Sequence, residues 1–331
     1  MEDRLLADLA QARLIKLDQL DWEDYCSTQR EAYAELLASQ GSNNAHMVPA
    51  FFEWKYRPPG CEGRIAIVTE GEKIIASNAM FPMRLHTPRG NCRAWQSCDT
   101  ATLPQARGKG CFAQCIHTLS QSLPEGDWFL GFPNANSRRG FEKLGWQLLR
   151  PVDTWVRPYI GPIWAGEFHH QVLEVGRFGP EQERLNACFK NSGATFFYRS
   201  PDYLNWRYCQ HPLYRYKLLA FVAGTDWLGF AVVRPGRVLR KNFLLILDLW
   251  ALNAKVESAL LGHAAAVAKV QGLTHAVLFD TGGRRLPKWR RGFCKVPPRF
   301  LSKRQLLMGQ IKGAATDYLD WRVQLGDWDV F

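Results

Sequence analysis

The sequence has no apolar run approaching the roughly 18 residues that a membrane-spanning helix needs, so no span is predicted. Its first residues lack a basic segment followed by an apolar stretch, and no secretory signal peptide is expected. Cys-x-x-Cys spacing is also missing, and the 9 cysteines are an odd number. This favours a reduced, cytoplasmic protein over a disulfide scaffold. Cys111 and Cys115 lie one helical turn apart without histidines at zinc spacing, so no metal site is predicted.

The chain of 331 residues is 47% hydrophobic and has a formal net charge of +11. The length indicates about two domains. A basic surface attracts acidic partners such as CoA, an acyl carrier protein, a nucleotide sugar or tRNA. We interpret the basic C-terminal stretch as a solvated face rather than a nucleic-acid surface, so no nucleic-acid partner is expected. Its residues are Arg284, Arg285, Lys288, Arg290, Arg291, Arg299, Lys303 and Arg304.

Residues 103–123 combine a strand end, a glycine turn and a helix start. A strand-like run, 94–102, stops at Pro104, and the turn Arg107-Gly108-Lys109-Gly110 follows. Glycines adopt positive φ easily, and the first turn of a helix has unpaired N–H groups that favour an anion. The stretch therefore predicts a phosphate or pyrophosphate site. The helix behind it should bury the face formed by Phe112, Ile116, Leu119 and Leu123.

Two common phosphate motifs do not fit this loop. Cys111 follows Gly110 where a P-loop would continue, and the third glycine of a dinucleotide fingerprint is missing. The loop instead resembles the acyl-CoA loop of the GNAT acyltransferase superfamily, Arg/Gln-x-x-Gly-x-Gly/Ala, with Phe112 departing from its last small position. The resemblance implies acetyl-CoA or another acyl-CoA as co-substrate. It also implies the CoA-binding residues Thr102, Leu103, Arg107, Gly108, Lys109, Gly110, Cys111 and Asn136.

The segment 132–146 resembles the later GNAT segment, in which an Asn precedes a short helix ending in Tyr-x-Lys-x-Gly-Phe. Ser137 is the expected N-cap of that helix and Gly145 its C-terminal glycine. Phe141 stands where many members of the superfamily have the tyrosine that protonates the departing thiolate. Turn chemistry is the alternative role for Asn134 and Asn136.

The second half of the chain repeats the first. Trp54-Lys55-Tyr56 is echoed by Trp206-Arg207-Tyr208, and the same order of elements follows each tripeptide. Each copy is predicted to hold a strand pair turning at Gly71 or Gly224, then a long strand, a helix and a short apolar strand. The long strands are 92–102 and 241–251, the helices 111–123 and 255–270, and the short strands 128–132 and 275–279. The second copy has no glycine loop, so it is predicted to bind no CoA and to wall off the acceptor site.

The fold class expected from this repeat is α/β (an α+β mixed sheet). Two tandem GNAT-like domains, each with its own central mixed sheet flanked by helices, should place Trp54 and Trp206 equivalently. The expected boundaries are residues 1–160 for the domain with the acyl-CoA loop, 161–180 for a linker and 181–331 for the degenerate domain. The chain resembles tandem GNAT acyltransferases, including a bacterial type associated with surface-polysaccharide genes. Its oligomeric state is not predicted.

The resemblance also implies a mechanism in which the thioester lies where the fourth strand parts from the fifth. A backbone N–H near Thr102 or Leu103 would then stabilise the oxyanion. Asp99 is the favoured general base, with a structural role as its alternative, and Cys98 as nucleophile is the sharper alternative. Strand alternation predicts that Asp99 and Cys98 point to opposite faces.

The function expected is N-acyl transfer from acyl-CoA, possibly replaced by an acyl carrier protein, to a small-molecule amine such as an amino sugar. The amine would attack directly, without a covalent enzyme intermediate. A Fem-like aminoacyltransferase that takes its donor from tRNA is one alternative, against which the intact glycine loop argues. A non-catalytic protein that senses CoA or binds a partner is the other.

Overall fold

The computed structural model describes residues 11–40, 46–158, 171–238, 241–281, 292–301, 305–310 and 320–328. The first half of the chain contains β1 (Arg13–Ile15), α2 (Trp22–Gln40), α3 (Pro49–Lys55), β2 (Arg64–Glu70), β3 (Lys73–Thr87), β4 (Gly90–Thr102), η1 (Pro104–Ala106), α4 (Cys111–Gln121), β5 (Trp128–Gly131), α5 (Ala135–Lys143) and β6 (Gln147–Pro158). The expected strands, glycine turn and helices of this half are therefore confirmed.

The second half contains β7 (Val172–Val175), α6 (Pro180–Lys190), β8 (Thr195–Phe197), α7 (Pro201–Leu204), the π-helical turn η3 (Asn205–Cys209), β9 (Lys217–Ala223), β10 (Asp226–Val238), β11 (Lys241–Ala251), α8 (Ala254–Val270) and β12 (His275–Asp280). The last elements are β13 (Cys294–Lys295), η5 (Pro298–Phe300), β14 (Gln305–Gln310), β15 (Trp321–Arg322) and η6 (Leu325–Asp327).

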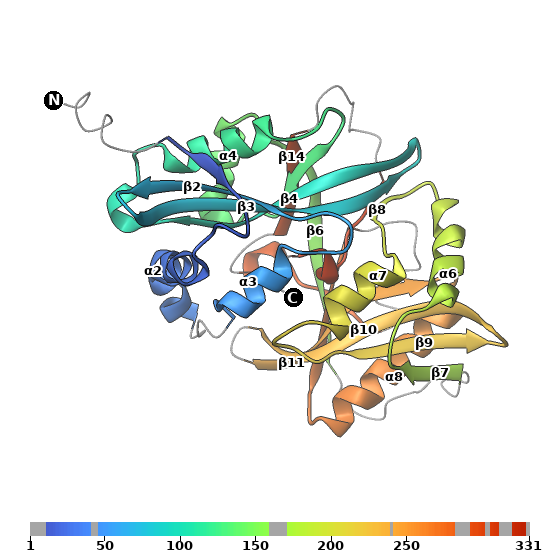
Figure 1. Ribbon diagram of the computed structural model, residues 1–331. Coiled ribbons are helices and arrows are strands. Elements are labelled where there is room, and N and C mark those ends of the chain that lie inside the picture. The colour runs from blue at the N-terminus through green and yellow to red at the C-terminus, as the bar shows by residue number, and fades with distance from the viewer. Residues whose placement is uncertain are drawn as a thin grey trace.

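Each half has a mixed sheet with a parallel pair of strands, β4 and β5 in the first and β11 and β12 in the second. A crossover helix joins the two strands of each of these pairs, as a parallel connection requires. A further parallel pair, β8 with β15, lies at the edge of the first sheet beside β3. Figure 1 shows α4 above the first sheet, α8 beneath the second, and α3 and α7 between the sheets. The mixed α/β class is confirmed, and so is the repeated order of elements, with the hairpin glycines Gly71 and Gly224 at positive φ.

The two halves exchange strands. Residues 147–152 of β6 pair with β14, and residues 153–158 pair with β12. The strand order is β1-β2-β3-β4-β5-β14-β6-β12-β11-β10-β9-β7. The prediction of a separate sheet in each copy is therefore wrong, because β14 from the end of the chain completes the first sheet and β6 completes the second.

The domain boundaries at 160 and 181 stay a prediction. Within the expected linker, residues 172–175 form β7, which pairs with β9, so this part of the linker prediction is wrong. Residues 159–170 lie outside the described residues. The short β7 could not be recognised locally because its partner strand begins more than 40 residues later.

Trp54 and Trp206 meet at the centre of the molecule. Their rings stack with centroids 4.7 Å apart, and each indole Nε1 donates to the main-chain oxygen of the other residue at 3.3 Å. Reciprocal contacts between equivalent residues are the signature of a twofold relation. The two copies are therefore related by a local pseudo-twofold axis, and the equivalence predicted for these tryptophans is confirmed.

Replacing either tryptophan of this pair by alanine should destabilise the protein to a similar extent. Trp206 is buried and Trp54 partly so, and loss of a buried indole costs about 3–5 kcal/mol. We expect the thermal midpoint to fall by roughly 5–10 °C in each variant. Trp206→Phe is the control, because it keeps an aromatic ring for the stacking but removes the N–H donor and part of the buried surface, so the midpoint should fall less than in the alanine variant. A midpoint that falls in only one of the two alanine variants would contradict a symmetric role.

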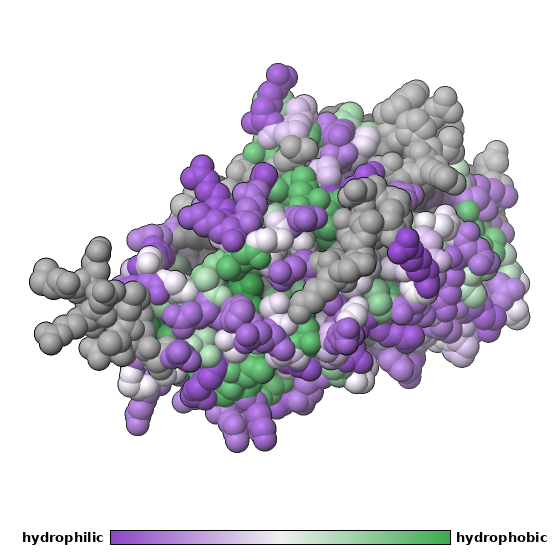
Figure 2. Space-filling model, turned by 90° about the horizontal axis from the view of Figure 1, so that it is seen from above, coloured by the Kyte–Doolittle hydropathy of each residue, from purple (hydrophilic) through white to green (hydrophobic). Residues whose placement is uncertain are grey.

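None of the helices described here is long and apolar enough to cross a membrane, and the cytoplasmic location stays a prediction. All nine cysteines are free thiols. On the face shown in Figure 2, hydrophilic residues dominate and hydrophobic ones form small groups between them. Of the basic C-terminal stretch, only Arg299 lies within the described residues.

Candidate active site

The strands β4 and β5 part at the point expected for a thioester site. They pair from Ala94 opposite Trp128 to Ser97 opposite Gly131, where β5 ends, while β4 continues to Thr102. A gap therefore opens beside the last residues of β4. The Leu103 N–H donates to the Ile75 oxygen at 2.9 Å, on the side of β3.

That hydrogen bond distinguishes the two predicted oxyanion donors. Successive N–H groups of a strand point to opposite edges, so the Thr102 N–H points toward the gap. The prediction that Leu103 could serve equally is wrong, because its N–H already holds β4 to β3. Leu103 instead contributes a fully buried side chain beneath α4.

A β-bulge at Asp99 turns its side chain toward Cys98. Ala79 pairs with Cys98 and Ser77 with Ala101, so two residues of β4 face Asn78 alone. Asp99 adopts φ +45°, which is rare outside glycine. The predicted placement of Asp99 and Cys98 on opposite faces is wrong, since strand alternation fails at a bulge.

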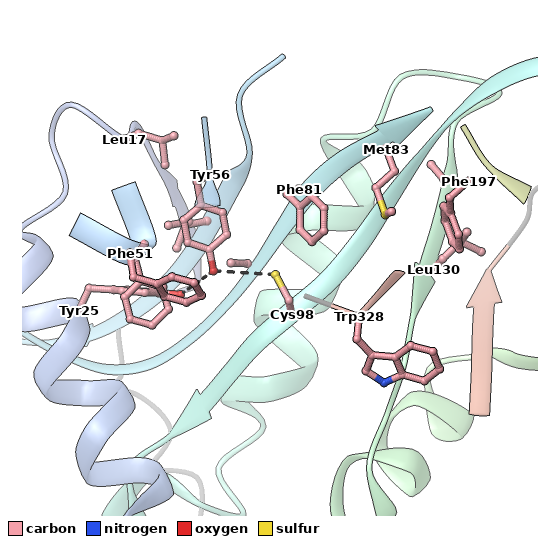
Figure 3. Close-up of a cluster of buried hydrophobic side chains, with 14 of the residues drawn as sticks. Leu17, Tyr25, Phe51, Tyr56, Phe81, Met83, Cys98, Leu130, Phe197 and Trp328 are labelled. Carbon is pink, nitrogen blue, oxygen red and sulfur yellow. Dashed lines mark hydrogen bonds between the residues drawn. The ribbon is translucent and has the colours of Figure 1, made fainter. Parts of the chain in front are cut away.

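Tyr56 contacts both of these side chains. Its Oη donates to Asp99 Oδ2 and lies 3.8 Å from Cys98 Sγ. Figure 3 shows Cys98 between Tyr25, Phe51 and Tyr56 on one side and Leu130, Phe197 and Trp328 on the other. Burial, and then the charge of Asp99, raises the pKa of Tyr56 well above its ordinary value. Tyr56 is therefore a neutral hydrogen-bond donor.

Lys55 forms an ion pair with the same carboxylate. Its Nζ lies 2.6 Å from Asp99 Oδ2, and the side chains are 2% and 12% exposed. Gln29 Nε2 donates to the Asp99 main-chain oxygen at 2.9 Å, and Tyr25 Oη lies 3.2 Å from Tyr56 Oη. The bulge is thus held from both α2 and α3. Oδ1 of Asp99 has no hydrogen-bond partner in the part of the chain that the structure describes.

The glycine loop is open where a ligand anion would lie. Gly108 and Gly110 both have φ +78°, and a Cβ at either position would meet no atom within 4 Å. Gly110 is the N-cap of α4 and provides no side-chain hydrogen bond to the first turn. The N–H groups of Cys111 and its successors are therefore available, although the Cys111 side chain itself is buried.

Charged side chains flank this loop. Arg107 is half exposed, with Nη1 3.9 Å from Glu35 Oε2 and Nη2 3.4 Å from the Ala32 oxygen. Such an exposed contact is weak and leaves the guanidinium able to bind an anion. Lys109 lies between the two glycines. The buried face of α4 is confirmed, with Ile116 and Leu119 in the core and Phe112 and Leu123 at its edge.

The corresponding helix of the second half closes its own N-terminus. Asn253 is the N-cap of α8, and its side chain accepts from the Val256 N–H at 3.0 Å. A capped helix with no glycine turn offers few free N–H groups to an anion. Of these two equivalent helices, α4 therefore has the N-terminus that is open to an anion.

The second half also has a carboxylate at the position equivalent to Asp99, and there it is buried by other side chains. Asp248 on β11 accepts from Tyr208 Oη, as Asp99 does from Tyr56. Arg199 Nη2 lies 2.9 Å from Asp248 Oδ1 and 2.5 Å from Asp327 Oδ1. Asp327 belongs to η6, so the C-terminal segment packs into this second position and buries it.

The segment after β5 differs in detail from the prediction. The N-cap of α5 is Asn134, whose side chain accepts from the N–H groups of Asn136 and Ser137. Ser137 completes the capping box from the third helical position, so its prediction as N-cap is wrong. Asn136 has an exposed side chain in the first turn of α5. Gly145 ends the helix at φ +81°, as predicted.

Phe141 belongs to the core beneath α4 and α5. It is 3% exposed and packs against Phe112 and Trp146, with ring centroids 5.1 and 4.4 Å away. A Cβ on Gly140 would lie 2.7 Å from the Phe112 ring. This explains why Phe112 can replace the usual small residue: its ring occupies space that Gly140 leaves.

Restoring a tyrosine at position 141 should leave acyl transfer unchanged or raise it slightly, by less than about threefold. The hydroxyl would return the usual acid of the superfamily, but in a packed position where an unpaired hydroxyl costs about 1–3 kcal/mol. The turnover number and the thermal midpoint of Phe141→Tyr are the measurements. A tenfold fall in turnover with an unchanged midpoint would contradict the expectation.

Lys55 and Tyr56 were not predicted as site residues. Their signal was present in the repeat, since Trp-Lys-Tyr and Trp-Arg-Tyr mark both copies. The repeat revealed the equivalence but not the partner, because Asp99 lies more than 40 residues away. Among the described residues, no group of three His, Cys, Asp or Glu side chains could hold a metal ion.

A parallel strand pair that parts beside a helix capped by glycine is the arrangement that the resemblance to GNAT acyltransferases predicts for an acyl-CoA site. The sequence of residues 13–149 matches the acetyltransferase (GNAT) domain family. No protein with a curated description matches the chain. The matched segment runs from β1 to the start of β6 and includes the glycine loop and Asp99, so the similarity to this family belongs to the first half of the chain.

Solved structures share the fold over most of the chain. A probable N-acyltransferase from Enterococcus faecalis V583 has a TM-score of 0.61 at 10% identity, covering 91% of this chain and 73% of its own. A GCN5-related N-acetyltransferase from Anabaena variabilis gives 0.60 at 11% identity, with coverages of 91% and 73%. One from Kribbella flavida gives 0.60 at 11%, with 92% and 72%. None of these descriptions mentions a polysaccharide, and that association stays a prediction.

Proposed function

We propose that the protein is an N-acyltransferase that moves an acyl group from acyl-CoA to the amine of a small molecule. The observation that carries this proposal is the uncapped N-terminus of α4, with Gly108 and Gly110, beside the gap between β4 and β5. A pyrophosphate is stabilised by free N–H groups and the helix dipole. A chain running from there along the open edge of β4 would bring its far end to Asp99.

The donor would be held by main chain and charge together. The N–H groups of the first turn of α4 would bind the pyrophosphate, with Arg107 and Lys109 adding positive charge. Asn136, exposed at the start of α5, would contact the donor from across the gap. Positioning of this kind supplies much of the rate of a transfer that needs little covalent chemistry.

The reaction forms the carbon–nitrogen bond of the amide, breaks the carbon–sulfur bond of the thioester and removes one proton from the amine. The amine nitrogen attacks the thioester carbonyl carbon, and the negative charge that develops on the oxygen is stabilised by the Thr102 N–H. The carbon–sulfur bond then breaks, giving the amide and the CoA thiolate. Asp99 Oδ1 would take the proton that the amine loses, while Lys55 and Tyr56 hold Oδ2.

Cys98 is not required as a nucleophile in this scheme. A thiol needs a nearby base to form the reactive thiolate, and its neighbour Tyr56 is a neutral phenol whose raised pKa keeps it protonated. Tyr56 therefore does not supply that base, and we propose direct attack by the amine without a covalent intermediate on Cys98.

The acceptor is proposed to lie on the face of the first sheet that the second half covers. Trp328 stacks on Phe132 with ring centroids 3.9 Å apart and also packs against Phe279. Phe132 directly follows the end of β5, so this aromatic group borders the gap. An amino sugar, which presents apolar ring faces as well as hydroxyls, is compatible with such a wall. A carrier protein remains an alternative donor.

The test is release of free CoA thiol from acetyl-CoA with a panel of amines, amino sugars included. We expect amine-dependent release at one donor site per chain. Binding of acetyl-CoA without turnover of any amine would favour the CoA-sensing alternative. Failure to bind acetyl-CoA, with transfer from aminoacyl-tRNA, would favour the Fem-like alternative.

A further inference from the structure

A cavity with several charged side chains in its lining lies in the second half of the molecule, at the end of α8 farthest from its N-cap. Its volume is about 550 Å³, within the range of small-molecule sites. Three of its lining side chains are cationic and one is acidic. The lining residues are Glu174, Leu213, Tyr214, Arg215, Tyr216, Lys217, Val233, Arg234, Pro235 and Gln271.

Arg234 is the central charge of this cavity. It is only 9% exposed, and its guanidinium lies over the Tyr214 ring at 4.0 Å. Nη1 donates to the Pro235 oxygen at 2.8 Å, while Nε has no hydrogen-bond partner among the residues that the structure describes. No carboxylate among the described residues lies within 4.0 Å of it. A buried guanidinium without a counterion is unfavourable, and an anion in the cavity would remove that cost.

The other charges leave the cavity positive. Lys217 is paired with Glu174 at 2.6 Å, so these two cancel. Arg215 is exposed and donates to the His211 oxygen at 3.2 Å, a contact that leaves its charge unpaired. The two positive charges of Arg215 and Arg234 therefore exceed the negative charge of about one half at the C-terminal end of the α8 dipole. The net charge of the cavity lining is positive.

The loop that carries Tyr214 and Arg215 is fixed by His211. Its Nδ1 accepts hydrogen bonds from the N–H groups of Leu213 and Tyr214, both at 3.1 Å. Burial first, and then the charges of three arginines that include Arg215 and Arg234, lowers the pKa of His211 to about 3. The imidazole is therefore neutral, and the loop is held without adding a further charge.

We propose that this cavity binds the phosphate group of a phosphate monoester, through Arg215 and Arg234. Planar guanidinium groups match phosphate oxygens with paired, charge-assisted hydrogen bonds. Tyr216, whose Oη is buried, adds a hydroxyl at the cavity wall. This site is separate from the acyl-CoA loop and does not depend on the proposed function.

Calorimetric titration tests the proposal with inorganic phosphate, ribose 5-phosphate and AMP as probes. The parent protein carries Gly108→Asp, so that the acyl-CoA loop does not contribute to the signal. We expect Arg234→Met and Arg215→Ala to weaken binding of the probes at least about tenfold, as loss of a charged hydrogen bond predicts. Arg215 is exposed, so its variant remains informative if Arg234→Met fails to fold.

The probes identify the source of the phosphate. Equal affinity for all three would indicate that the phosphate group alone is recognised, whereas tighter binding of ribose 5-phosphate or AMP would add the sugar or the base. Arg184→Ala is the matched control, because Arg184 is an exposed arginine of the same half, paired with Asp226 outside the cavity. Absence of binding in the parent, or equal affinity in parent and cavity variants, would overturn the proposal.

Discussion

Replacing Gly108 by aspartate is expected to abolish acetyl-CoA binding. Gly108 has φ +78° in a loop whose N–H groups face open space, so a side chain would both strain the backbone and occupy the ligand's position. The new carboxylate would repel the pyrophosphate at the N-terminus of α4. We expect no measurable heat in calorimetry with this variant, whereas the unmodified protein should bind one acetyl-CoA per chain.

Gly71→Asp is the matched control for that variant. Gly71 also has positive φ, +60°, with open space around it, but it lies in the hairpin between β2 and β3. The same strain and charge there should leave donor affinity unchanged. Two donor sites per chain, or an unaltered affinity in Gly108→Asp, would show that the loop is not the cradle.

The local part of this fold could be predicted because its signals are local. Gly71, Gly145 and Gly224 mark turns by their conformation, and the amphipathic pattern of α4 follows its buried face. The long strands of both copies were predicted within two residues of their observed ends. The absence of a cradle in the second copy was also predictable, since Asn253 replaces the glycines.

The strand exchange could not be predicted in the same way. β14 and β6 each have an ordinary strand pattern, and neither pattern predicts which sheet the strand joins. The partners are set by long-range packing, since Leu307 and Val152 enter the core of the first half. The alternating pattern of β6 fits either sheet. The strand is long enough for its first half to pair in the first sheet and its second half in the second.

For the candidate site, only those residues that lie close together in the sequence could be predicted. Asp99, Thr102 and the glycine loop follow one another in sequence, and their roles derive from spacing. The partners of Asp99 come from α2 and α3, and the bulge that turns its side chain is a property of the paired strands. Strand alternation failed at Asp99 for that reason.

Asp99→Asn should lower the acyl-transfer rate by about 10²–10³ at neutral pH, the contribution typical of a general base. Donor affinity should change little, because Asp99 lies at the reacting end of the site and the phosphates bind at Gly108 and Gly110. A group that acts on the transition state alone lowers turnover without raising the donor KM. Raising the pH should restore part of the rate, because more of the acceptor amine is then already neutral.

The Asp99→Asn variant also loses the ion pair with Lys55. The resulting loss of stability must be separated from the loss of catalytic rate. Asparagine leaves the ammonium of Lys55 buried without its carboxylate, and breaking such a pair destabilises a protein by up to about 3–5 kcal/mol. The rate is therefore expressed per donor site, counted by calorimetry, at a temperature where the variant is folded. Asp248→Asn is the control, since it removes the equivalent buried carboxylate, which pairs with Arg199, from the half that has no cradle.

The two variants should differ in kind. Asp248→Asn is expected to lower the thermal midpoint while keeping the rate per donor site, because Asp248 lies on β11 of the half that has no donor cradle. Asp99→Asn should lower both, with only its rate recovering at high pH. Full activity per site in Asp99→Asn would exclude Asp99 as the base. Equal loss of rate in both variants would mean that the two carboxylates act only through the stability of the fold.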